Sequence, residues 1–378
     1  MKFMHISDLH LGKRVNEFSM LEDQKDILRK ILKIADEEKP QALLIAGDVY
    51  DKSIPTVEAI QLFDDFLCEL SKRKVQTFII SGNHDSAERM AFGGRLMKES
   101  GVYVAPVYAG KTQAVVLEDE WGPINIYLLP FVKPANVKRF FEDEQIENYT
   151  DAIRVAVEQM KLNTDERNVL VTHQFVTGAK RSESEDISVG GTDNVDASVF
   201  DEFDYVALGH IHGPQKIGRE TVRYCGTPLK YSFSEIHHKK SVTIVEMKEK
   251  GNVEICTKEL APLRDWCEMK GSYMELTEKA YYKNLDQDSY MHITLTDEED
   301  IPEAVRKLQV IYPNVMKLDY DNQRTRGKAA FLEAAEVEEK TPFDIFEELY
   351  EKQNNQEMNE EQKKLIHDLV EKIWEGGH

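Results

Sequence analysis

The first half of the 378-residue chain alternates short apolar runs with longer amphipathic stretches. The apolar runs, rich in valine, isoleucine, leucine and phenylalanine, occur at residues 2–6, 42–46, 75–80, 169–172 and 205–208. Short runs of this kind, each leading into a polar segment, predict buried strands. Between the first three runs, apolar residues such as Ile60, Phe63 and Leu67 recur at helical spacing and predict helices that bury one face. Strands that alternate with helices in this way predict an α/β fold.

The pattern changes after about residue 121, where strands follow one another with turns between them. The predicted strands lie at residues 124–129, 221–224, 241–246 and 253–258. They indicate a second sheet packed on the first. Farther on, residues 291–295, 301–310 and 315–318 have the pattern of a strand, a helix and a strand. The expected fold class is therefore α/β (α+β), a two-sheet sandwich flanked by helices, with a small α/β domain and C-terminal helices.

Changes in composition divide the chain into four predicted segments. Residues 1–262 contain all the polar motifs described below and form the main domain, and residues 263–324 form the small domain. Residues 321–328 are polar and mixed in charge, and an acidic stretch follows them through Glu338, which predicts a linker at residues 325–340. In residues 341–378 apolar side chains again recur at helical spacing and predict a C-terminal helical segment. This segment is too short to form a hydrophobic core of its own, so it either folds back on its own domain or docks on a partner.

The composition is typical of a soluble globular protein, with 31% charged and 41% hydrophobic residues. No apolar run approaches the roughly 18 residues that are needed to cross a bilayer. The first residues lead straight into a strand without the architecture of a signal peptide. We therefore expect a cytoplasmic protein with no membrane association.

The cysteines lie far apart and form no CxxC pair, so neither a zinc ribbon nor a disulfide framework is indicated.

The formal net charge of −21 argues against a protein that binds nucleic acid through a broad basic surface. Two circumstances weaken this objection. Bound divalent cations invert the local field at a site rich in carboxylates. A partner protein could also carry the basic surface that this chain lacks.

Aspartate, asparagine and histidine are concentrated in a few polar segments that follow the ends of predicted strands. These segments are Asp8-Leu9-His10, Gly47-Asp48, Gly82-Asn83-His84-Asp85, His173, and Gly209-His210-Ile211-His212. Side chains two residues apart on an extended backbone lie on the same side, so one metal can take both Asp8 and His10, and the rings of His210 and His212 also lie on one side. Two divalent ions about 3.5–4 Å apart can bind both the attacking and the leaving oxygen of a phosphate ester.

The order of these segments predicts two ligand sets that share a bridging carboxylate, Asp48. The first set is Asp8, His10, Asp48 and His212, and the second set is Asp48, Asn83, His173 and His210. Oxygen and imidazole ligands without thiolate suit manganese, iron or zinc better than calcium. Any one of these fragments occurs by chance in many chains, whereas the complete set in this order favours a dinuclear centre.

Two further residues of the third segment are predicted to act in catalysis rather than as ligands. His84 follows a predicted ligand and is expected to protonate the leaving oxygen or to stabilise charge on the phosphorane. Asp85 is expected to hold the His84 ring in the required tautomer. By contrast, His237 and His238 are interpreted as capping a turn or touching phosphate rather than as metal ligands.

These ordered motifs resemble the calcineurin-like metallophosphoesterases, whose fold is two packed mixed sheets flanked by helices. The finer similarity is to the family of bacterial SbcD nuclease subunits. The residues that carry the resemblance are 5–12, 46–51, 81–86, 207–212 and Tyr224-Cys225-Gly226-Thr227-Pro228. The resemblance implies a manganese-dependent DNA nuclease, with exonuclease action on double-stranded ends and endonuclease action on single strands and hairpins. It also implies a role in DNA repair, recombination and replication.

The same resemblance implies partners. The chain would form a homodimer within a heterotetramer that contains an SbcC-type coiled-coil ATPase. The predicted helices around residues 57–70 and 87–97 are candidate faces for the dimer that could equally belong to the core. The terminal helices would grip the coiled coil of the ATPase, and the small domain would cap the DNA site. Archaeal and eukaryotic relatives have a histidine where this chain has Asp51, so a role of that histidine in positioning DNA is not carried over.

Two other functions are compatible with the motifs. The chain could be another phosphoesterase of the same fold that acts on phosphoprotein, cyclic nucleotide or nucleotide. Protein phosphatases of the superfamily have Gly-Asp-x-Val-Asp-Arg-Gly, whereas this chain has Gly47-Asp48-Val49-Tyr50-Asp51-Lys52, which disfavours a protein phosphatase. The chain could also be a non-catalytic scaffold, although every predicted ligand is present.

Overall fold

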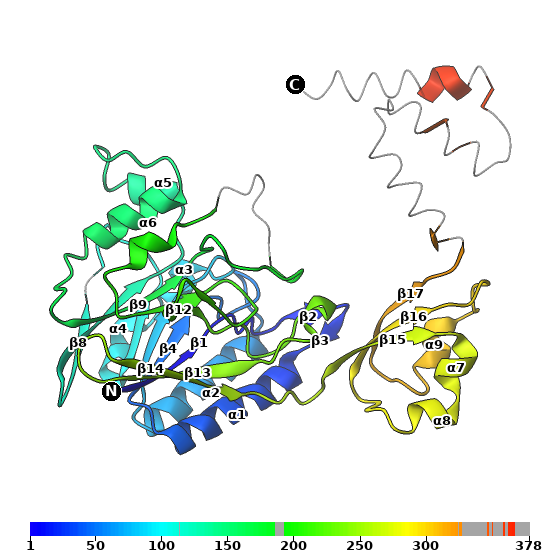
Figure 1. Ribbon diagram of the computed structural model, residues 1–378, viewed down its shortest axis with the longest axis horizontal. Coiled ribbons are helices and arrows are strands. Elements are labelled where there is room, and N and C mark those ends of the chain that lie inside the picture. The colour runs from blue at the N-terminus through cyan, green and yellow to red at the C-terminus, as the bar shows by residue number, and fades with distance from the viewer. Residues whose placement is uncertain are drawn as a thin grey trace. The chain divides into compact units, whose positions relative to one another are not determined.

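The computed structural model describes residues 1–112, 114–185, 193–323, 325–326, 346–347, 350, 358–359 and 362–366 (Figure 1). The chain divides into two compact units. The first comprises Met1–Glu268, Asp286–His292 and Asn314–Lys317, and the second comprises Met269–Leu285, Ile293–Pro313 and Leu318–His378. The predicted linker at 325–340 and the predicted helical segment at 341–378 lie almost wholly outside the described residues. The domain boundaries drawn from the sequence therefore stay predictions.

The first sheet has six strands in the order β14-β13-β1-β4-β5-β6. These strands are β1 (Lys2–Ile6), β4 (Ala42–Ala46), β5 (Gln76–Ile80), β6 (Val102–Ala105), β13 (Ser241–Met247) and β14 (Val253–Glu259). Strands β1, β4, β5 and β6 are parallel, whereas β13 runs antiparallel to β1 and to β14. The sheet is thus mixed, with a parallel centre.

The second sheet also has six strands, in the order β11-β12-β10-β9-β8-β7. These strands are β7 (Val115–Asp119), β8 (Gly122–Leu129), β9 (Arg167–His173), β10 (Tyr205–Gly209), β11 (Gln215–Ile217) and β12 (Arg219–Tyr224). Strands β8, β9, β10 and β12 are parallel, and β7 and β11 pair antiparallel at the two edges. The expectation of a second sheet is correct, but its membership differs. Strands β13 and β14 join the first sheet, because β13 pairs with β1 from Lys2↔Glu246 to His5↔Thr243.

Both faces of the first sheet are buried, and the alternation of side chains separates two cores. Phe3 and Leu44 belong to the cluster that also contains Val169 of the other sheet. Met4 and Ile45 belong to the cluster on the opposite face. The sequence pattern of these strands is therefore a nearly continuous apolar run rather than an alternation of apolar and polar residues.

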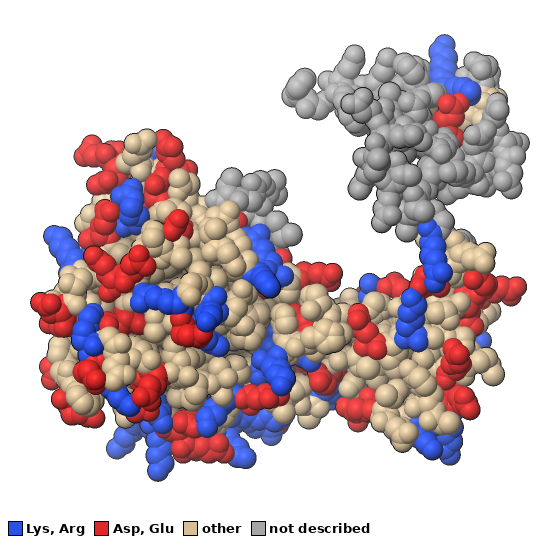
Figure 2. Space-filling view, in the orientation of Figure 1, with Lys and Arg blue, Asp and Glu red and all other residues tan. Residues whose placement is uncertain are grey.

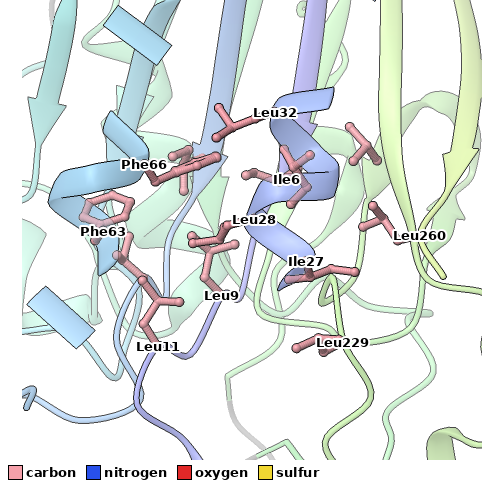
Figure 3. Close-up of a cluster of buried hydrophobic side chains, with 14 of the residues drawn as sticks. Ile6, Leu9, Leu11, Ile27, Leu28, Leu32, Phe63, Phe66, Leu229 and Leu260 are labelled. Atoms are coloured by element: carbon pink, nitrogen blue, oxygen red, sulfur yellow. The ribbon is translucent and has the colours of Figure 1, made fainter. Parts of the chain in front are cut away.

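Two long helices cover the outer face of the first sheet. Helix α1 (Leu21–Glu38) and helix α2 (Val57–Lys72) place their apolar faces on β1 and its neighbours. Figure 3 shows this core, in which Leu28 from α1 and Phe66 from α2 lie near Ile6 of β1. Helix α6 (Tyr149–Glu158) contributes to the corresponding cluster against the second sheet. The predicted sandwich flanked by helices is therefore present.

The remaining elements are short. In the first unit they are β2 (Arg14–Val15), β3 (Phe18–Ser19), α3 (Ala87–Met90), α4 (Gly94–Met97), η1 (Lys98–Ser100), α5 (Pro134–Lys138), η2 (Ala197–Phe200) and η3 (Phe233–Glu235). Farther along the chain a third sheet, in the order β15-β16-β17, accompanies short helices. These elements are β15 (Trp266–Gly271), α7 (Tyr273–Thr277), α8 (Lys279–Tyr282), β16 (Tyr290–Leu295), α9 (Ala304–Leu308) and β17 (Val315–Tyr320). Among the described residues no helix is long and apolar enough to cross a membrane.

Candidate metal centre

The polar segments follow the carboxyl ends of the central parallel strands of both sheets. Asp8 and Asp48 lie two residues beyond β1 and β4 of the first sheet, and Asn83 lies three residues beyond β5. His173 is the last residue of β9, and His210 directly follows β10 of the second sheet. The carboxyl ends of parallel strands are where open α/β sheets bind ligands. The two sheets therefore deliver their polar side chains to one shared edge.

Several of these residues have backbone conformations that side chains other than glycine seldom adopt. The φ angles of Asp8, His10, Asp48 and His210 are 54°, 43°, 48° and 101°. Each such residue costs on the order of 1–3 kcal/mol and persists only where the surroundings hold it. Here the Asp8 amide donates to the Gly47 carbonyl and the His10 amide donates to the Asp48 carbonyl, both at 3.0 Å. The loops after β1 and β4 thus fix one another.

Two glycines permit the close approach of these loops. A Cβ atom on Gly82 would lie 2.1 Å from Asp48 Oδ1, and one on Gly209 would lie 1.8 Å from the Ala46 carbonyl oxygen. Real Cβ contacts are essentially never this short, so no other residue fits at either position unless its surroundings move. The glycines flanking the predicted ligands are therefore required by packing.

The first predicted ligand set is brought together. His10 Nε2 lies 3.2 Å from His212 Nε2, and one potential ligand atom each of Asp8, His10 and His212 lies within 4.8 Å of the others. Asp48 Oδ2 is 3.8 Å from His10 Nε2. Two imidazole lone pairs this close repel each other unless a proton or a cation lies between them. Metal–nitrogen bonds of about 2.0–2.1 Å span such a gap, so these residues fit a divalent ion.

The second predicted set is also brought together. Asn83 Oδ1 lies 3.0 Å from both His173 Nε2 and His210 Nδ1. Asp48 Oδ2 lies 3.3 Å from His173 Nε2. Asp48 therefore contacts both groups of side chains, as a bridging carboxylate must. The other ring nitrogen of His173, Nδ1, lies 2.8 Å from the Ala46 carbonyl oxygen, which leaves Nε2 directed at the cluster.

Burial sets the protonation of two imidazoles in this centre. Burial lowers the pKa of His210 to about 3 and holds the pKa of His10 well below its usual range. Both rings are therefore neutral at neutral pH, with lone pairs available to a metal. Burial also raises the pKa of the Asp8 carboxyl to about 6.

His173 behaves differently because it faces a carboxylate. Burial by itself would lower its pKa, but the charge of Asp48 and a hydrogen bond to it outweigh burial and raise the pKa of His173 to about 9. In return, His173 holds the pKa of Asp48 well below its usual range although burial opposes this. Without metal, Asp48 and His173 thus form a buried ion pair.

His84 lies at the rim of the centre. Its amide donates to Asp48 Oδ1 at 2.9 Å, and its ring Nε2 lies 3.9 Å from Asp48 Oδ2. Its ring Nδ1 lies 3.1 Å from the Asp51 carbonyl oxygen, so Nδ1 donates to that oxygen and Nε2 faces the cluster. One potential ligand atom each of His84, His10 and Asp48 lies within 4.8 Å of the others.

The predicted role of Asp85 needs correction. Its carboxylate accepts hydrogen bonds from the backbone amides of Val49 at 3.1 Å, Tyr50 at 2.9 Å and Gly82 at 2.9 Å. These bonds engage both carboxylate oxygens, and it is the Asp51 carbonyl that orients the His84 ring. Asp85 therefore joins the loop after β5 to the loop after β4 and acts on the site through the backbone.

Sequence reasoning missed the residues that surround His212. Ser184 Oγ lies 2.6 Å from His212 Nδ1, and Glu185 Oε1 accepts a hydrogen bond from the His212 amide at 2.6 Å. Lys240, close in sequence to the histidines interpreted as capping a turn, is only 4% exposed and donates to the His212 carbonyl. No periodicity or motif marks these residues, because only the folded chain brings them to His212.

A packed pair of mixed sheets with clustered carboxylate, amide and imidazole ligands at their shared edge defines a metal-dependent phosphoesterase. A family model described as "Calcineurin-like phosphoesterase" matches residues 1–214, and one described as "Type 5 capsule protein repressor C-terminal domain" matches residues 257–354. The chain belongs to the calcineurin-like phosphoesterase family.

A curated relative narrows the assignment. The SbcD subunit of nuclease SbcCD from Staphylococcus epidermidis is 32% identical over 379 residues, which cover 98% of this chain and 98% of that protein. The predicted fold class and the resemblance to the SbcD nuclease subunits are confirmed.

Two solved structures are more distantly similar, each at 14% identity. One is a dimetal phosphatase from Danio rerio, with a TM-score of 0.40 over 69% of this chain and 99% of that chain. The other is the protein TT1561 of Thermus thermophilus, with a TM-score of 0.38 over 68% of this chain and 98% of that chain. At these scores they add nothing to the family assignment.

Proposed function

We propose that this chain is the DNA nuclease subunit of an SbcCD-type complex and hydrolyses phosphodiesters with two divalent ions. Its substrates are double-stranded ends, which it degrades as an exonuclease, and single strands and hairpins, which it cuts as an endonuclease. The relative named as a subunit of nuclease SbcCD supports this proposal, because the similarity covers 98% of both chains. A cytoplasmic location and a role in DNA repair, recombination and replication belong to the same proposal.

One observation carries the proposal: a single carboxylate, Asp48, reaches His10 of one sheet at 3.8 Å and His173 of the other at 3.3 Å. We assign Asp8, His10, Asp48 and His212 to one ion and Asp48, Asn83, His173 and His210 to the other. Ligands of this kind, with no thiolate, suit manganese, iron or zinc, and the resemblance to the SbcD nuclease subunits leads us to propose Mn²⁺ as the native metal. When bound, the two ions would supply charge stabilisation at the phosphate and activation of a water molecule.

The chain itself supplies proton transfer and orientation. His84 presents Nε2 to the cluster because the Asp51 carbonyl holds Nδ1. We assign to His84, with a proton on Nε2 as well as on Nδ1, the protonation of the leaving oxygen or the stabilisation of negative charge on the phosphate. Asp85 contributes by fixing the loop that carries Asn83 and His84 to the loop that carries Asp48.

A homodimer is the assembly that the surface of α2, α3 and the following residues supports. Val57, Ile60, Phe92 and Leu96 are 65%, 46%, 89% and 76% exposed, although they are apolar. Exposed apolar patches of this kind mark interaction sites. We propose that two copies associate through this face, to which both candidate segments from the sequence contribute.

An ATPase partner completes the proposed complex. On the face drawn in Figure 2, Lys and Arg side chains are interspersed with Asp and Glu. The net charge of −21 gives the chain little affinity of its own for a polyanion. An SbcC-type coiled-coil ATPase, bound by the C-terminal segment, would supply that affinity, and the complex would be a heterotetramer. The small domain would cap the DNA.

Cleavage assays with Mn²⁺ test the proposal. The chain, alone and with an SbcC-type ATPase, would be given linear duplex DNA, hairpin DNA and p-nitrophenyl phosphate esters. We expect the DNA to be cut and the Asp48→Asn variant to be inactive. Hydrolysis of small esters without DNA cleavage would instead identify a phosphoesterase for phosphoprotein or nucleotide. Two bound ions without any hydrolysis would identify a non-catalytic scaffold.

A further inference from the structure

A closed circuit of hydrogen bonds begins at the ring of His212 and ends at its own carbonyl group. His212 Nδ1 lies 2.6 Å from Ser184 Oγ, and the Ser184 hydroxyl donates to Glu235 Oε1. Glu235 Oε2 accepts from Lys240 Nζ, which also donates to the His212 carbonyl at 2.9 Å. The Lys240 ammonium donates as well to Thr227 Oγ1 at 2.6 Å. Each of its three protons therefore has an acceptor.

The ion pair of the circuit is buried, whereas Ser184 is partly exposed. Glu235 is 0% exposed and Lys240 is 4% exposed. A buried ion pair repays its desolvation only when its remaining donors and acceptors are also satisfied. The full complement of bonds around Lys240 meets that condition, so Glu235 and Lys240 are fixed in one geometry. They in turn fix Ser184 and the backbone of His212.

The direction of the bonds defines the tautomer of His212. The single hydroxyl hydrogen of Ser184 goes to Glu235, so Ser184 Oγ can only accept a hydrogen bond from His212. His212 therefore carries its proton on Nδ1 and its lone pair on Nε2. That lone pair faces His10 Nε2 at 3.2 Å, within the first ligand set.

We propose that Ser184, Glu235 and Lys240 are positioning residues that present His212 Nε2 to one of the two metal ions. The inference rests on the dinuclear centre assigned above and adds an asymmetry to it. Among the proposed ligands, the circuit bonds to His212, at its ring and at its carbonyl. The ring of His173 is instead oriented by the Ala46 carbonyl. Loss of the circuit should therefore weaken the binding of the ion in the first ligand set and leave the binding of the other ion unchanged.

Binding of Mn²⁺ to the full-length chain tests this asymmetry without recourse to activity. Free Mn²⁺ would be followed by electron paramagnetic resonance during titration of the wild type and the Ser184→Ala, Ser184→Thr and Glu235→Gln variants. We expect two ions on the wild type. In Ser184→Ala and Glu235→Gln the affinity for one ion should fall by about 10- to 100-fold, while the affinity for the other ion should not change. Ser184→Thr retains the hydroxyl and should stay within a few-fold of the wild type.

Ser71→Ala is the matched control, because Ser71 is partly exposed like Ser184 and its hydroxyl donates to the Ser100 carbonyl rather than to a residue of the circuit. Thermal unfolding in chelator reports whether each variant is folded. Unchanged binding of both ions in Ser184→Ala and Glu235→Gln would overturn the proposal. Equal weakening of both ions would overturn it as well, because the circuit would then only hold the loop. If the wild type binds two ions but cuts no DNA, the proposed nuclease function is wrong, but the positioning role of the circuit is not affected.

Discussion

Asp48 Oδ2 and His173 Nε2 lie 3.3 Å apart although Asp48 follows a strand of the first sheet and His173 ends a strand of the second. This contact joins the two layers of the sandwich at the edge where the polar loops gather. It also places a carboxylate charge and an imidazolium charge in a buried site, where each shifts the pKa of the other. The chemistry of the site therefore depends on how the layers are packed.

Replacing Asp48 with asparagine should remove both the ion pair and the carboxylate that we propose the two ions share. We expect the variant to lose at least one of the two bound ions. Hydrolysis of hairpin DNA should fall by about 10³-fold, equivalent to several kcal/mol of transition-state stabilisation. Metal content and cleavage rate measure the effect. Asp65→Asn, at an exposed position of α2, is the control and should match the wild type.

Metal binding should release a proton from His173. Its pKa of about 9 in the metal-free protein means that the ring is protonated at pH 7, and it must lose that proton to bind a metal. Calorimetry in two buffers of different ionisation enthalpy should give about one proton released from this ring at pH 7, falling toward zero above pH 9. Metal affinity should rise with pH over the same interval. Binding at pH 7 without proton release would contradict the assignment.

The stability of the metal-free protein should depend on the same group. The pKa of His173 is raised from 6.5 in the unfolded chain to about 9 in the folded one. Protonation therefore stabilises the fold, fully below pH 6.5, and this contribution is lost as the pH rises through 9. Denaturant unfolding in chelator should give a smaller free energy of unfolding at about pH 9.5 than at pH 7. His173→Phe should flatten this slope.

Replacing His84 with alanine should separate turnover from metal binding. Because the backbone amide of His84, not its ring, bonds to Asp48 Oδ1, the variant should keep both ions. The cleavage rate should fall by about 10²- to 10⁴-fold, as expected for loss of a proton donor. His292→Ala removes a histidine of β16, outside the polar segments, and serves as the control. Loss of metal in His84→Ala would identify His84 as a ligand instead.

Replacing Gly82 with alanine should displace Asp48. The added Cβ would lie 2.1 Å from Asp48 Oδ1, so the loop must move at an overpacking cost of about 1–3 kcal/mol. We expect a lower melting temperature together with weaker Mn²⁺ binding. Gly94→Ala, whose new Cβ would meet its nearest neighbour at an ordinary 3.8 Å, should change neither property. Unaltered Mn²⁺ affinity in Gly82→Ala would show that the site tolerates the shift.

Replacing Phe92 with glutamate should prevent the proposed homodimer. Phe92 is 89% exposed and apolar, and a buried unpaired charge at the same place would oppose association. Sedimentation should give the mass of a dimer for the wild type and of a monomer for Phe92→Glu. Met274→Glu introduces the same charge at a residue that is 75% exposed in the second unit, and it should leave the mass unchanged. A monomeric wild type would remove the basis of this prediction.

The parallel strands and the ligand order were predictable because local patterns determine them. β1 and β4 are apolar runs whose bounds coincide with the predicted ones, and the glycine of Gly47-Asp48 marks the turn that follows. The helix predicted between the first two runs is α1, which begins at Leu21.

What could not be predicted depends on contacts between distant segments. Strand β13 follows the strands of the second sheet along the chain but pairs with β1, and periodicity does not specify partners. The carboxylate of Asp85 accepts from three backbone amides, and two of these belong to the loop after β4, far away in the sequence. Ser184 and Glu235 are 51 residues apart and have no common motif.

The amides of Asp8 and His10, which bond to the carbonyls of Gly47 and Asp48, also bear on how the central sheet assembles. With apolar surroundings on both faces of β1, sliding the strand by one position against β4 would exchange one apolar environment for another, so hydrophobicity scarcely penalises the error. A shift by one residue would break both loop bonds, which therefore favour the native alignment. We expect substitutions in the segments that carry the candidate ligands to yield mispaired chains as well as inactive ones.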